Sequence, residues 1–263
     1  MKILLLGGTK DSTNIIKHLK ESHEVYILTT TTTEYGAKLA REAGSDDTIA
    51  RPLLKDEIVE IIKENNFDIL IDATHPFAEH ITQTSSTIAS ELKMPYIRFE
   101  RPTTNLENID TSHIHYVNSF DEAGKLIANE FENGNVLHFA GANTMADIVK
   151  YVPTERFYPR ILKVESSIKK CDELDIDPDH IIAMTGAATK EENIDLIERY
   201  DASVMITKES GEIGGVIEKI EAANEKDIAV IMIKRPKIET LNKNDIVSDL
   251  NDLDTKVLKN RLI

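Results

Sequence analysis

The sequence predicts an α/β protein in which two doubly wound, mainly parallel sheets are each covered by helices on both faces. Short apolar segments without polar alternation recur along the chain, as expected for strands buried on both sides. Segments with apolar residues at helical spacing separate them. The alternation stops once, over the polar residues 103–113, and then starts again. This single interruption predicts two α/β domains joined by a linker.

The first half of the chain contains four predicted strands, each followed or preceded by a helix. The strands are the apolar runs at residues 2–8, 24–30, 67–74 and 94–102. The helices cover residues 11–22, 34–44, 55–66 and 78–92. In the third helix Ile58, Ile61 and Ile62 fall on one face, which is typical of a helix packed against a sheet. We expect residues 1–102 to form the first domain.

The second half repeats this pattern, and we expect residues 103–263 to form the second domain, with 103–113 as its linker. The predicted strands are residues 135–141, 156–162, 180–186, 202–210 and 228–236. Capping boxes, Ser119 with Glu122 and Thr189 with Glu192, mark the starts of two helices, and residues 214–226 form another. Residues 237–263 are an acidic turn and a last helix, and the sequence leaves open which domain they join.

The composition excludes several classes of protein. No apolar run approaches the roughly 18 residues of a membrane helix. The formal net charge of −15 argues against a nucleic-acid binder, which needs a basic face. The single cysteine, Cys171, excludes a disulfide within the chain and fits a reducing cytoplasm. We expect a cytoplasmic protein, monomeric or a small homo-oligomer, without membrane or nucleic-acid partners.

A glycine pair lies between the first strand and the first helix, in the segment LLLGGT. Gly7 and Gly8 would let the backbone approach a phosphate at the start of a helix. The strict G-x-G-x-x-G pattern is absent, so a plain tight turn remains an alternative. The second strand ends in threonines 29–33, where an NAD site usually carries an acid. These hydroxyls suit the 2′-phosphate of NADP better, unless threonine is there only for its strand propensity.

The segment ILIDATHPFAEH, residues 69–80, opens from a buried strand into a cluster of polar side chains. In a doubly wound sheet this loop lies at the carboxyl edge, where ligands bind. We expect Pro76 to start the following helix, His75 to face the ligand and Asp72 to orient His75 or cap the helix. The alternative is a capped helix start with a surface histidine. His75 and His80 do not have the spacing of a metal-binding pair, and we expect no metal ligands.

Cations follow several other strands, as an anionic ligand of an acidic protein requires. Arg98 and Arg101 lie around the end of the strand in RFERP, and Lys234 lies in IKRP. The loop TKESGEIGG contains Lys208 and Ser210 beside the pair Gly214–Gly215, a composition typical of oxyanion sites. A surface lysine and a tight turn are the alternatives.

Taken together, these motifs closely resemble those of the precorrin-6A reductases. The resemblance rests on GGTKDS, Tyr35–Gly36, DATHPFA, PYIRFERP, IIAMTG, TKESGEIGGVIEKIEAA and IKRP, in that order, over about residues 3–236. It implies two Rossmann-like domains, with a nicotinamide coenzyme in the first and an anionic tetrapyrrole in the cleft between them. It also implies reduction of a macrocycle double bond during cobalamin synthesis. One departure is Thr13, where many members carry an arginine.

The motifs and the resemblance together give candidate residues for each role. For NADPH or NADH they are Gly7, Gly8, Thr9, Thr29, Thr30, Thr31, Thr74, His75 and Pro76. For the tetrapyrrole they are Phe77, Arg98, Arg101, Lys208, Ser210, Gly214 and Gly215. Hydride transfer needs positioning, because the coenzyme supplies the reducing power. His75 and Lys208 are candidates for the proton donor, and water is a third.

Other functions fit the sequence less well. A short-chain dehydrogenase or epimerase needs a Tyr-x-x-x-Lys pair, but Tyr35, Tyr96 and Tyr151 are followed four residues later by other residue types. A nucleotide-sensing module would not need a second domain with its own glycine loop. The composition, rich in Ile, Lys and Asn and without Trp, gives a slight preference for the cobalt-containing, anaerobic substrate.

Overall fold

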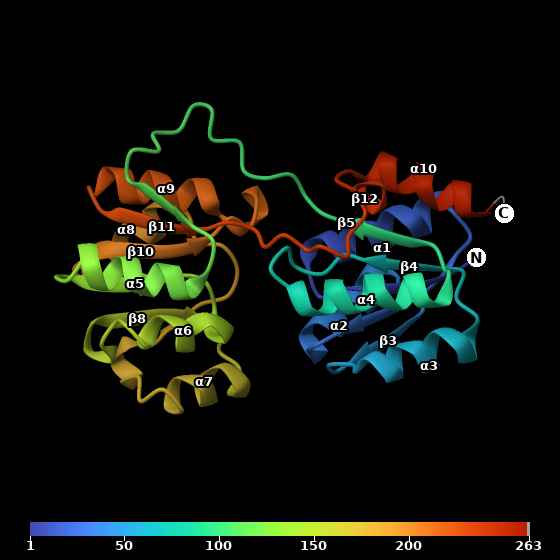
Figure 1. Cartoon of the computed structure of the whole chain (residues 1–263), viewed down its shortest axis with the longest axis horizontal. Helices are drawn as coiled ribbons and strands as arrows, with labels where there is room; N and C mark the ends of the chain where they lie inside the picture. The colour runs from blue at the N-terminus through green and yellow to red at the C-terminus, as the bar shows by residue number, and fades with distance from the viewer. Residues whose placement is uncertain (262–263) are drawn as a thin grey trace. The chain divides into compact units, whose positions relative to one another are not determined.

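The computed structural model describes residues 1–261 and divides the chain into two compact units. The first unit comprises Met1–Pro102 together with the tail that begins at Pro236, and the second comprises Thr103–Arg235. Each unit contains a six-stranded sheet in which every recorded strand pair is parallel (Figure 1). The predicted α/β class with two parallel sheets is therefore confirmed.

The sheet of the first unit has the strand order β12-β5-β4-β1-β2-β3. Its strands are β1 Lys2–Leu6, β2 Tyr26–Thr31, β3 Asp47–Ala50, β4 Ile69–Asp72, β5 Tyr96–Phe99 and β12 Ile246–Val247. Its helices are α1 Lys10–Ser22, α2 Glu34–Ala43, α3 Lys55–Asn65, α4 Glu79–Leu92 and α10 Leu250–Arg261, with the 3-10 turn η5 Lys243–Asp245. The chain order reverses between β1 and β4, and in sheets of this type ligands bind at such a point of the carboxyl edge.

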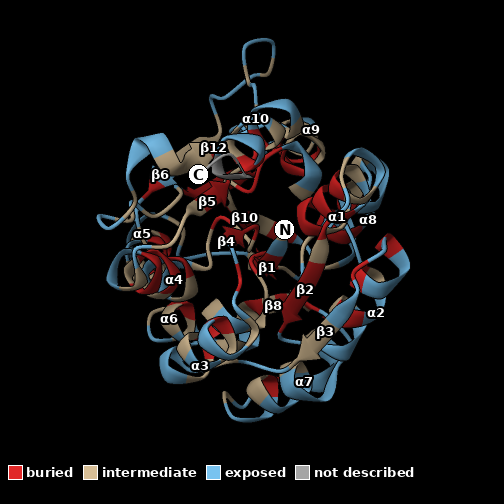
Figure 2. Ribbon diagram, turned by 90° about the vertical axis from the view of Figure 1, so that its right-hand side faces the viewer, coloured by how far each residue is buried: buried red, intermediate tan, exposed pale blue. Residues whose placement is uncertain are grey.

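The central strand β1 shows why its sequence lacks polar alternation. Ile3 and Leu5 pack into one core cluster with residues of α1, α2 and α10. Leu4 and Leu6 pack into another cluster with residues of α3 and α4. Figure 2 shows the resulting burial in β1, β2 and β4. A strand with helices on both faces must be apolar at every position.

The tail, whose placement the sequence left open, belongs to the first unit and not to the second, in which the expected range 103–263 had included it. Strand β12 pairs with β5, where Ile246 lies opposite Arg98 and Val247 opposite Phe99. Leu253 and Val257 of α10 are buried in the core of the first unit. The pairing joins residues far apart in the chain through a two-residue strand, which no local sequence pattern reveals.

The sheet of the second unit has the order β6-β11-β10-β7-β8-β9. Its strands are β6 Ile114–Val117, β7 Asn135–His138, β8 Phe157–Ile161, β9 Ile182–Ala183, β10 Ala202–Lys208 and β11 Ala229–Ile233. Its helices are α5 Phe120–Glu130, α6 Met145–Val149, α7 Glu165–Asp172, α8 Lys190–Arg199 and α9 Val216–Glu225. The 3-10 turns are η1 Ala142–Thr144, η2 Thr154–Arg156, η3 Pro178–His180 and η4 Glu212–Gly214.

Local signals in the second unit agree with the structure at two helix starts. Thr189 and Glu192 form the predicted capping box of α8. At α5, Ser119 accepts the N–H of Glu122, but the carboxylate of Glu122 accepts the N–H of Asn118. The predicted linker also packs on this unit, since its Leu106 and Ile109 contact a cluster formed by Val216, Ile220 and Met232. Among the helices of residues 1–261, none combines the length and apolar character needed to cross a membrane.

Candidate functional site

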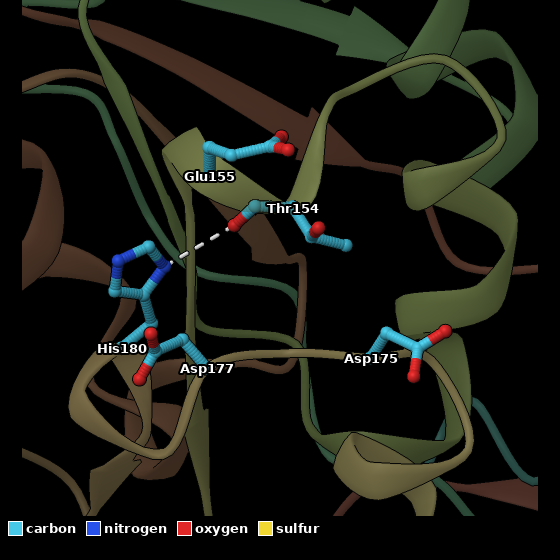
Figure 3. Close-up of a pocket in the computed structure, with 5 residues that line it drawn as sticks. All are labelled: Thr154, Glu155, Asp175, Asp177 and His180. Carbon is cyan, nitrogen blue, oxygen red and sulfur yellow. Dashed lines mark hydrogen bonds between the residues drawn. The ribbon is translucent and has the colours of Figure 1, made fainter.

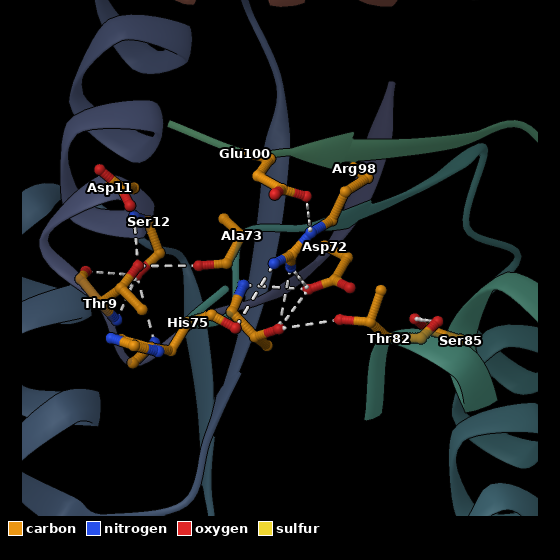
Figure 4. A network of polar contacts seen from close by, with 12 residues as sticks. Thr9, Asp11, Ser12, Asp72, Ala73, His75, Thr82, Ser85, Arg98 and Glu100 are labelled. Carbon is orange, nitrogen blue, oxygen red and sulfur yellow. Dashed lines mark hydrogen bonds and ion pairs between the residues drawn. The ribbon is translucent and has the colours of Figure 1, made fainter. Parts of the chain in front are cut away.

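The loops that follow β1 and β4 meet at the carboxyl edge of the first sheet. Thr9 begins α1 as its N-cap, and its hydroxyl donates a hydrogen bond of 2.7 Å to the carbonyl of Ala73 (Figure 4). This bond joins the predicted coenzyme loop to the predicted catalytic loop. The structure therefore brings Gly7, Gly8 and Thr9 close to the segment that contains His75.

Glycine is required in the first loop for two different reasons. A Cβ on Gly7 would lie 2.9 Å from Cγ2 of Thr29 and 3.0 Å from Oγ of Ser12, too close for real atoms. Gly8 has a φ of +95°, a conformation that L side chains rarely adopt. The glycine pair therefore lets the chain pass tightly over β2 and turn into the helix.

Ser12 is a residue of this loop that the sequence analysis missed. Its hydroxyl oxygen accepts the N–H groups of Gly8 at 3.2 Å and Thr9 at 3.1 Å. Its backbone N–H donates to Oγ1 of Thr9 at 3.1 Å, which completes a capping box. The spacing of Thr9 and Ser12, N-cap and third helical residue, is the sequence signal that could have revealed it.

A buried ion pair holds the loop after β4. Nη1 of Arg98 donates to Oδ1 of Asp72 at 2.8 Å, and both side chains are completely buried. Oδ1 of Asp72 also accepts the N–H of Thr74 at 2.9 Å and its hydroxyl at 2.7 Å. Oδ2 accepts the hydroxyl of Tyr96 at 3.1 Å. Burial, and then the charge of Asp72, raise the pKa of Tyr96, so this phenol stays protonated.

His75 and Phe77 lie together in the turn that follows. The N–H of Phe77 donates to Nδ1 of His75 at 3.2 Å, and the two ring centres are 5.9 Å apart. A ring nitrogen that accepts a hydrogen bond carries no proton, so the neutral imidazole holds its proton on Nε2. The carbonyl of His75 accepts the N–H of Ala78 at 2.8 Å, and α4 begins at Glu79. The prediction that Pro76 starts this helix is therefore wrong by three residues, because the chain turns once more first.

Three of the predicted site residues have partners within the first unit. Arg98 was predicted to bind substrate, but it is completely buried and bonded to Asp72 and Thr74. Arg101 forms an ion pair of 2.5 Å with Asp11, in the first turn of α1. Thr29 was predicted to contact the coenzyme, but it is completely buried and its hydroxyl lies 2.7 Å from that of Ser45. Contacts within the first unit therefore explain why Arg98 and Thr29 stand at these two positions.

The remaining threonines of β2 lie at the end of the strand. Thr30 and Thr31 are buried, with exposed fractions of 8% and 4%. The hydroxyl of Thr31 donates to the carbonyl of Thr33 at 2.9 Å, and Thr33 caps α2 by accepting the N–H of Gly36. These hydroxyls thus shape the turn that leads into α2.

The predicted substrate residues of the second unit surround the turn after β10. Burial lowers the pKa of Lys208, the last residue of β10, to about 8. A Cβ on Gly214 would lie only 1.8 Å from Oγ of Ser210, so these two residues are packed against each other. Gly215 has a φ of +65° and ends this turn at the start of α9. Lys208, Ser210 and both glycines therefore share one loop.

A separate hollow of about 330 Å³ lies elsewhere in the second unit (Figure 3). It is lined by Thr154, Glu155, Asp175, Asp177 and His180. Nδ1 of His180 lies 3.2 Å from the carbonyl of Thr154, and its ring stacks on Tyr158 at 4.2 Å. Within residues 1–261 no group of three or more His, Cys, Asp or Glu side chains is placed to hold a metal ion. The hollow contains none of the predicted site residues.

The two parallel sheets with polar loops at their carboxyl ends define the class: this is a doubly wound α/β protein of the Rossmann type. A family model described as "Precorrin-6x reductase CbiJ/CobK" matches residues 2–257. The chain belongs to this family of reductases, and the resemblance seen in the sequence is confirmed.

Individual relatives agree with the family assignment. The chain is 38% identical over 260 residues to the cobalt-precorrin-6A reductase of Methanothermobacter thermautotrophicus, covering 98% of this chain and 84% of that protein. It is 41% identical over 240 residues to the cobalt-precorrin-6A reductase of Methanocaldococcus jannaschii, covering 91% and 92%. A solved structure, "CobK precorrin-6A reductase", aligns with a TM-score of 0.76 over 99% of this chain and 97% of that one, at 17% identity. That structure supports the fold.

Proposed function

We propose that this protein reduces a double bond of cobalt-precorrin-6A, with hydride from NADPH or NADH. The observation that carries the proposal is the identity of 38% and 41%, over nearly the whole chain, to two archaeal cobalt-precorrin-6A reductases. The metal-free precorrin-6A is the alternative substrate. The cobalt form is favoured because the names printed for both archaeal relatives specify cobalt.

The loop after β1 fits the dinucleotide. The close approach of Gly7 to Thr29 and the positive φ of Gly8 leave a backbone surface without side chains at the start of α1. Helix N-termini attract phosphates through their N–H groups and dipole. Gly7, Gly8 and Thr9 would therefore hold the pyrophosphate, while Thr30 and Thr31 lie at the end of β2, where the adenosine ribose is held in such folds.

The chain's own residues would bind and orient the tetrapyrrole and would supply the proton for its double bond. When bound, the nicotinamide supplies the hydride that adds to one carbon of the double bond. The neighbouring carbon then needs a proton. Burial lowers the pKa of Lys208 to about 8, so its ammonium can donate a proton near neutral pH, and the ring of His75 is the other candidate. Thr74 and Pro76 fix the loop of His75, Phe77 offers an apolar surface, and Ser210, Gly214 and Gly215 line the loop of Lys208.

An anaerobic assay tests the proposed reaction directly. The purified protein is mixed with cobalt-precorrin-6A or precorrin-6A, and NADPH or NADH is followed by its absorbance. We expect oxidation of the coenzyme only when a tetrapyrrole is present, with formation of the dihydro product in equal amount. Absence of oxidation with both tetrapyrroles and both coenzymes would contradict the proposal.

A further inference from the structure

Three cationic side chains, those of Arg160, Lys208 and Lys219, lie at the carboxyl edge of the second sheet. His138, the last residue of β7, pairs with Ile206 of β10 on one side and with Pro159 of β8 on the other. Lys208 follows Ile206 by two residues, and Arg160 follows Pro159 directly. Lys208 and Arg160 therefore lie on the two strands that flank β7, at the carboxyl edge of the sheet. Lys219 comes from α9, the helix that follows the loop of Lys208.

Lys219 is buried and Arg160 is partly buried, and neither has a full set of partners. Lys219 is only 3% exposed, and its ammonium donates to the carbonyl of Gly214 at 2.7 Å. The guanidinium of Arg160 lies 4.6 Å from the ring centre of Phe139, and its Nη1 is buried with no hydrogen-bond partner. In the described part of the chain, neither side chain forms an ion pair within 4 Å.

The charges of this cluster act on one another. Burial first, and then the charges of Arg160 and Lys208, lower the pKa of Lys219 to about 7. Glu218 opposes this effect, but it is the weakest of the four causes, and Glu192 acts on Arg160. His138 adds no further charge, because burial lowers its pKa to about 3. Like charges in a buried place are costly unless an anion compensates them.

We propose that Arg160, Lys208 and Lys219 form a subsite in the second unit that binds a peripheral carboxylate of the tetrapyrrole. This inference rests on the proposed function, which supplies a macrocycle rich in carboxylates. The planar guanidinium of Arg160 offers two parallel N–H donors to the carboxylate, and the two ammonium groups add charge. Arg160 and Lys219 thereby join the substrate residues predicted from the sequence, and select for the carboxylated edge of the macrocycle.

Neither residue could be recognised as a ligand from its position in the sequence. Arg160 lies inside the strand segment RFYPRIL, and Lys219 lies on an amphipathic helix between apolar neighbours. A lysine at such a position is usually expected to extend to the surface. Only the fold brings the end of β8, the end of β10 and α9 to the same place.

Two substitutions and two matched controls test the subsite. Arg160→Gln and Lys219→Met each remove one charge, while Arg199→Gln and Lys226→Met remove the same charges from α8 and the C-terminal end of α9. We expect the KM for cobalt-precorrin-6A to rise about tenfold or more in the first pair, because a charge-assisted hydrogen bond is lost. The KM for the coenzyme should stay within about twofold in all four variants, and Arg160→Lys should restore part of the loss.

The melting temperature separates binding from folding. Lys219→Met removes a buried charge and keeps the length of the side chain, so we expect its melting temperature to equal or exceed that of the wild type. A lower melting temperature with an unchanged KM for the tetrapyrrole would overturn the subsite and leave Lys219 with a structural role. Equal rises of both KM values would also overturn it.

A binding measurement keeps the subsite testable apart from the reaction. Uroporphyrin, a porphyrin with carboxylates around its rim, is titrated into each protein and followed by its fluorescence. We expect weaker binding to Arg160→Gln and Lys219→Met than to the wild type and the controls. If the wild type reduces neither tetrapyrrole, the proposed function fails, and equal uroporphyrin affinities then overturn the subsite as well. If inorganic phosphate binds at these residues while tetrapyrrole affinity is unchanged in the variants, the carboxylate assignment is wrong.

Discussion

The hydroxyl of Thr9 is bonded to the carbonyl of Ala73, across 64 residues of sequence. The same oxygen accepts the N–H of Ser12 and so caps α1. One side chain therefore both starts the helix behind the proposed pyrophosphate site and holds the loop of His75. We therefore expect coenzyme binding at this loop and the position of His75 to be coupled through Thr9.

Thr9→Val should lose both bonds and keep the shape of the side chain. We expect a loss of about 1–2 kcal/mol in the free energy of unfolding, the usual range for a lost cap. The KM for the coenzyme should rise together with this loss of stability. Urea denaturation and steady-state kinetics measure both effects. Thr13→Val is the control, since the hydroxyl of Thr13 donates to the carbonyl of Lys10 within its own helix, and equal effects of the two substitutions would contradict the coupling.

Arg98→Met should be strongly destabilising, because it leaves the carboxylate of Asp72 charged and buried. Breaking a buried ion pair by removing one partner costs about 3–5 kcal/mol. Lys55→Met is the control, since Lys55 pairs with Glu91 at the surface and such pairs contribute at most about 1 kcal/mol. Denaturation curves compare the two. A loss from Arg98→Met as small as that from Lys55→Met would show that the pair does not hold the loop.

Gly214→Ala should disturb the tetrapyrrole site through Ser210. The added Cβ would lie 1.8 Å from Oγ of Ser210, so the loop of Lys208 must move. We expect a higher KM for the tetrapyrrole, of about tenfold, and an unchanged KM for the coenzyme. The double variant Gly214→Ala with Ser210→Gly removes the clash. A double variant that binds the tetrapyrrole no better than Gly214→Ala alone would indicate that the effect has another cause.

The activity should depend on pH through Lys208, which is a candidate proton donor and also part of the proposed carboxylate subsite. Burial lowers its pKa to about 8, so the ammonium form is present below this pH and is lost above it. We expect kcat/KM to fall as the pH rises through about 8. Lys208→Met should lack this fall, whereas His75→Gln should keep it. A profile of Lys208→Met that falls at the same pH as the wild type would assign the proton to another group.

The stability should depend on pH through Lys219. Its pKa is about 7 in the folded protein and 10.5 for an ordinary lysine, so between these values the unfolded chain binds more protons. Stability therefore rises with pH over this window, in contrast to a lysine held by a carboxylate. Lys219→Met should have a smaller rise between pH 7 and 10 than the wild type in denaturation experiments. Parallel curves would contradict the buried position of the charge.

Much of the fold could be predicted because long apolar strands and amphipathic helices are local signals. The missed strands have weak signals. Strand β3 is a half-exposed edge strand with the sequence DTIA, β6 has four residues of which one is buried, and β12 has two residues. The missed helices are short: α6 has five residues and α7 has eight, too few for a clear periodic pattern. Strand order depends on contacts between distant segments, so no local pattern could give it.

The candidate site was predicted in part. The loops of Gly7, His75 and Lys208 were found because polar residues after an apolar run are visible in the sequence. The direction in which each side chain points was not visible in the sequence, and this explains the two corrections, at Arg98 and Thr29. Arg98 and Thr29 lie on strands beside buried partners, Asp72 and Ser45, which are 26 and 16 residues away. Which neighbour a strand residue faces is decided by the sheet, not by its own surroundings in the chain.

Because β12 and α10 return to the first unit, that unit is assembled from both ends of the polypeptide. During translation, residues 103–235 emerge from the ribosome before the strand that completes the first sheet exists. A nascent chain stopped at Pro102 would leave the edge of β5 open and the partners of Leu253 and Val257 uncovered. The inserted unit is thus the one that can finish folding first, and the first unit must wait until β12 and α10 have been synthesised.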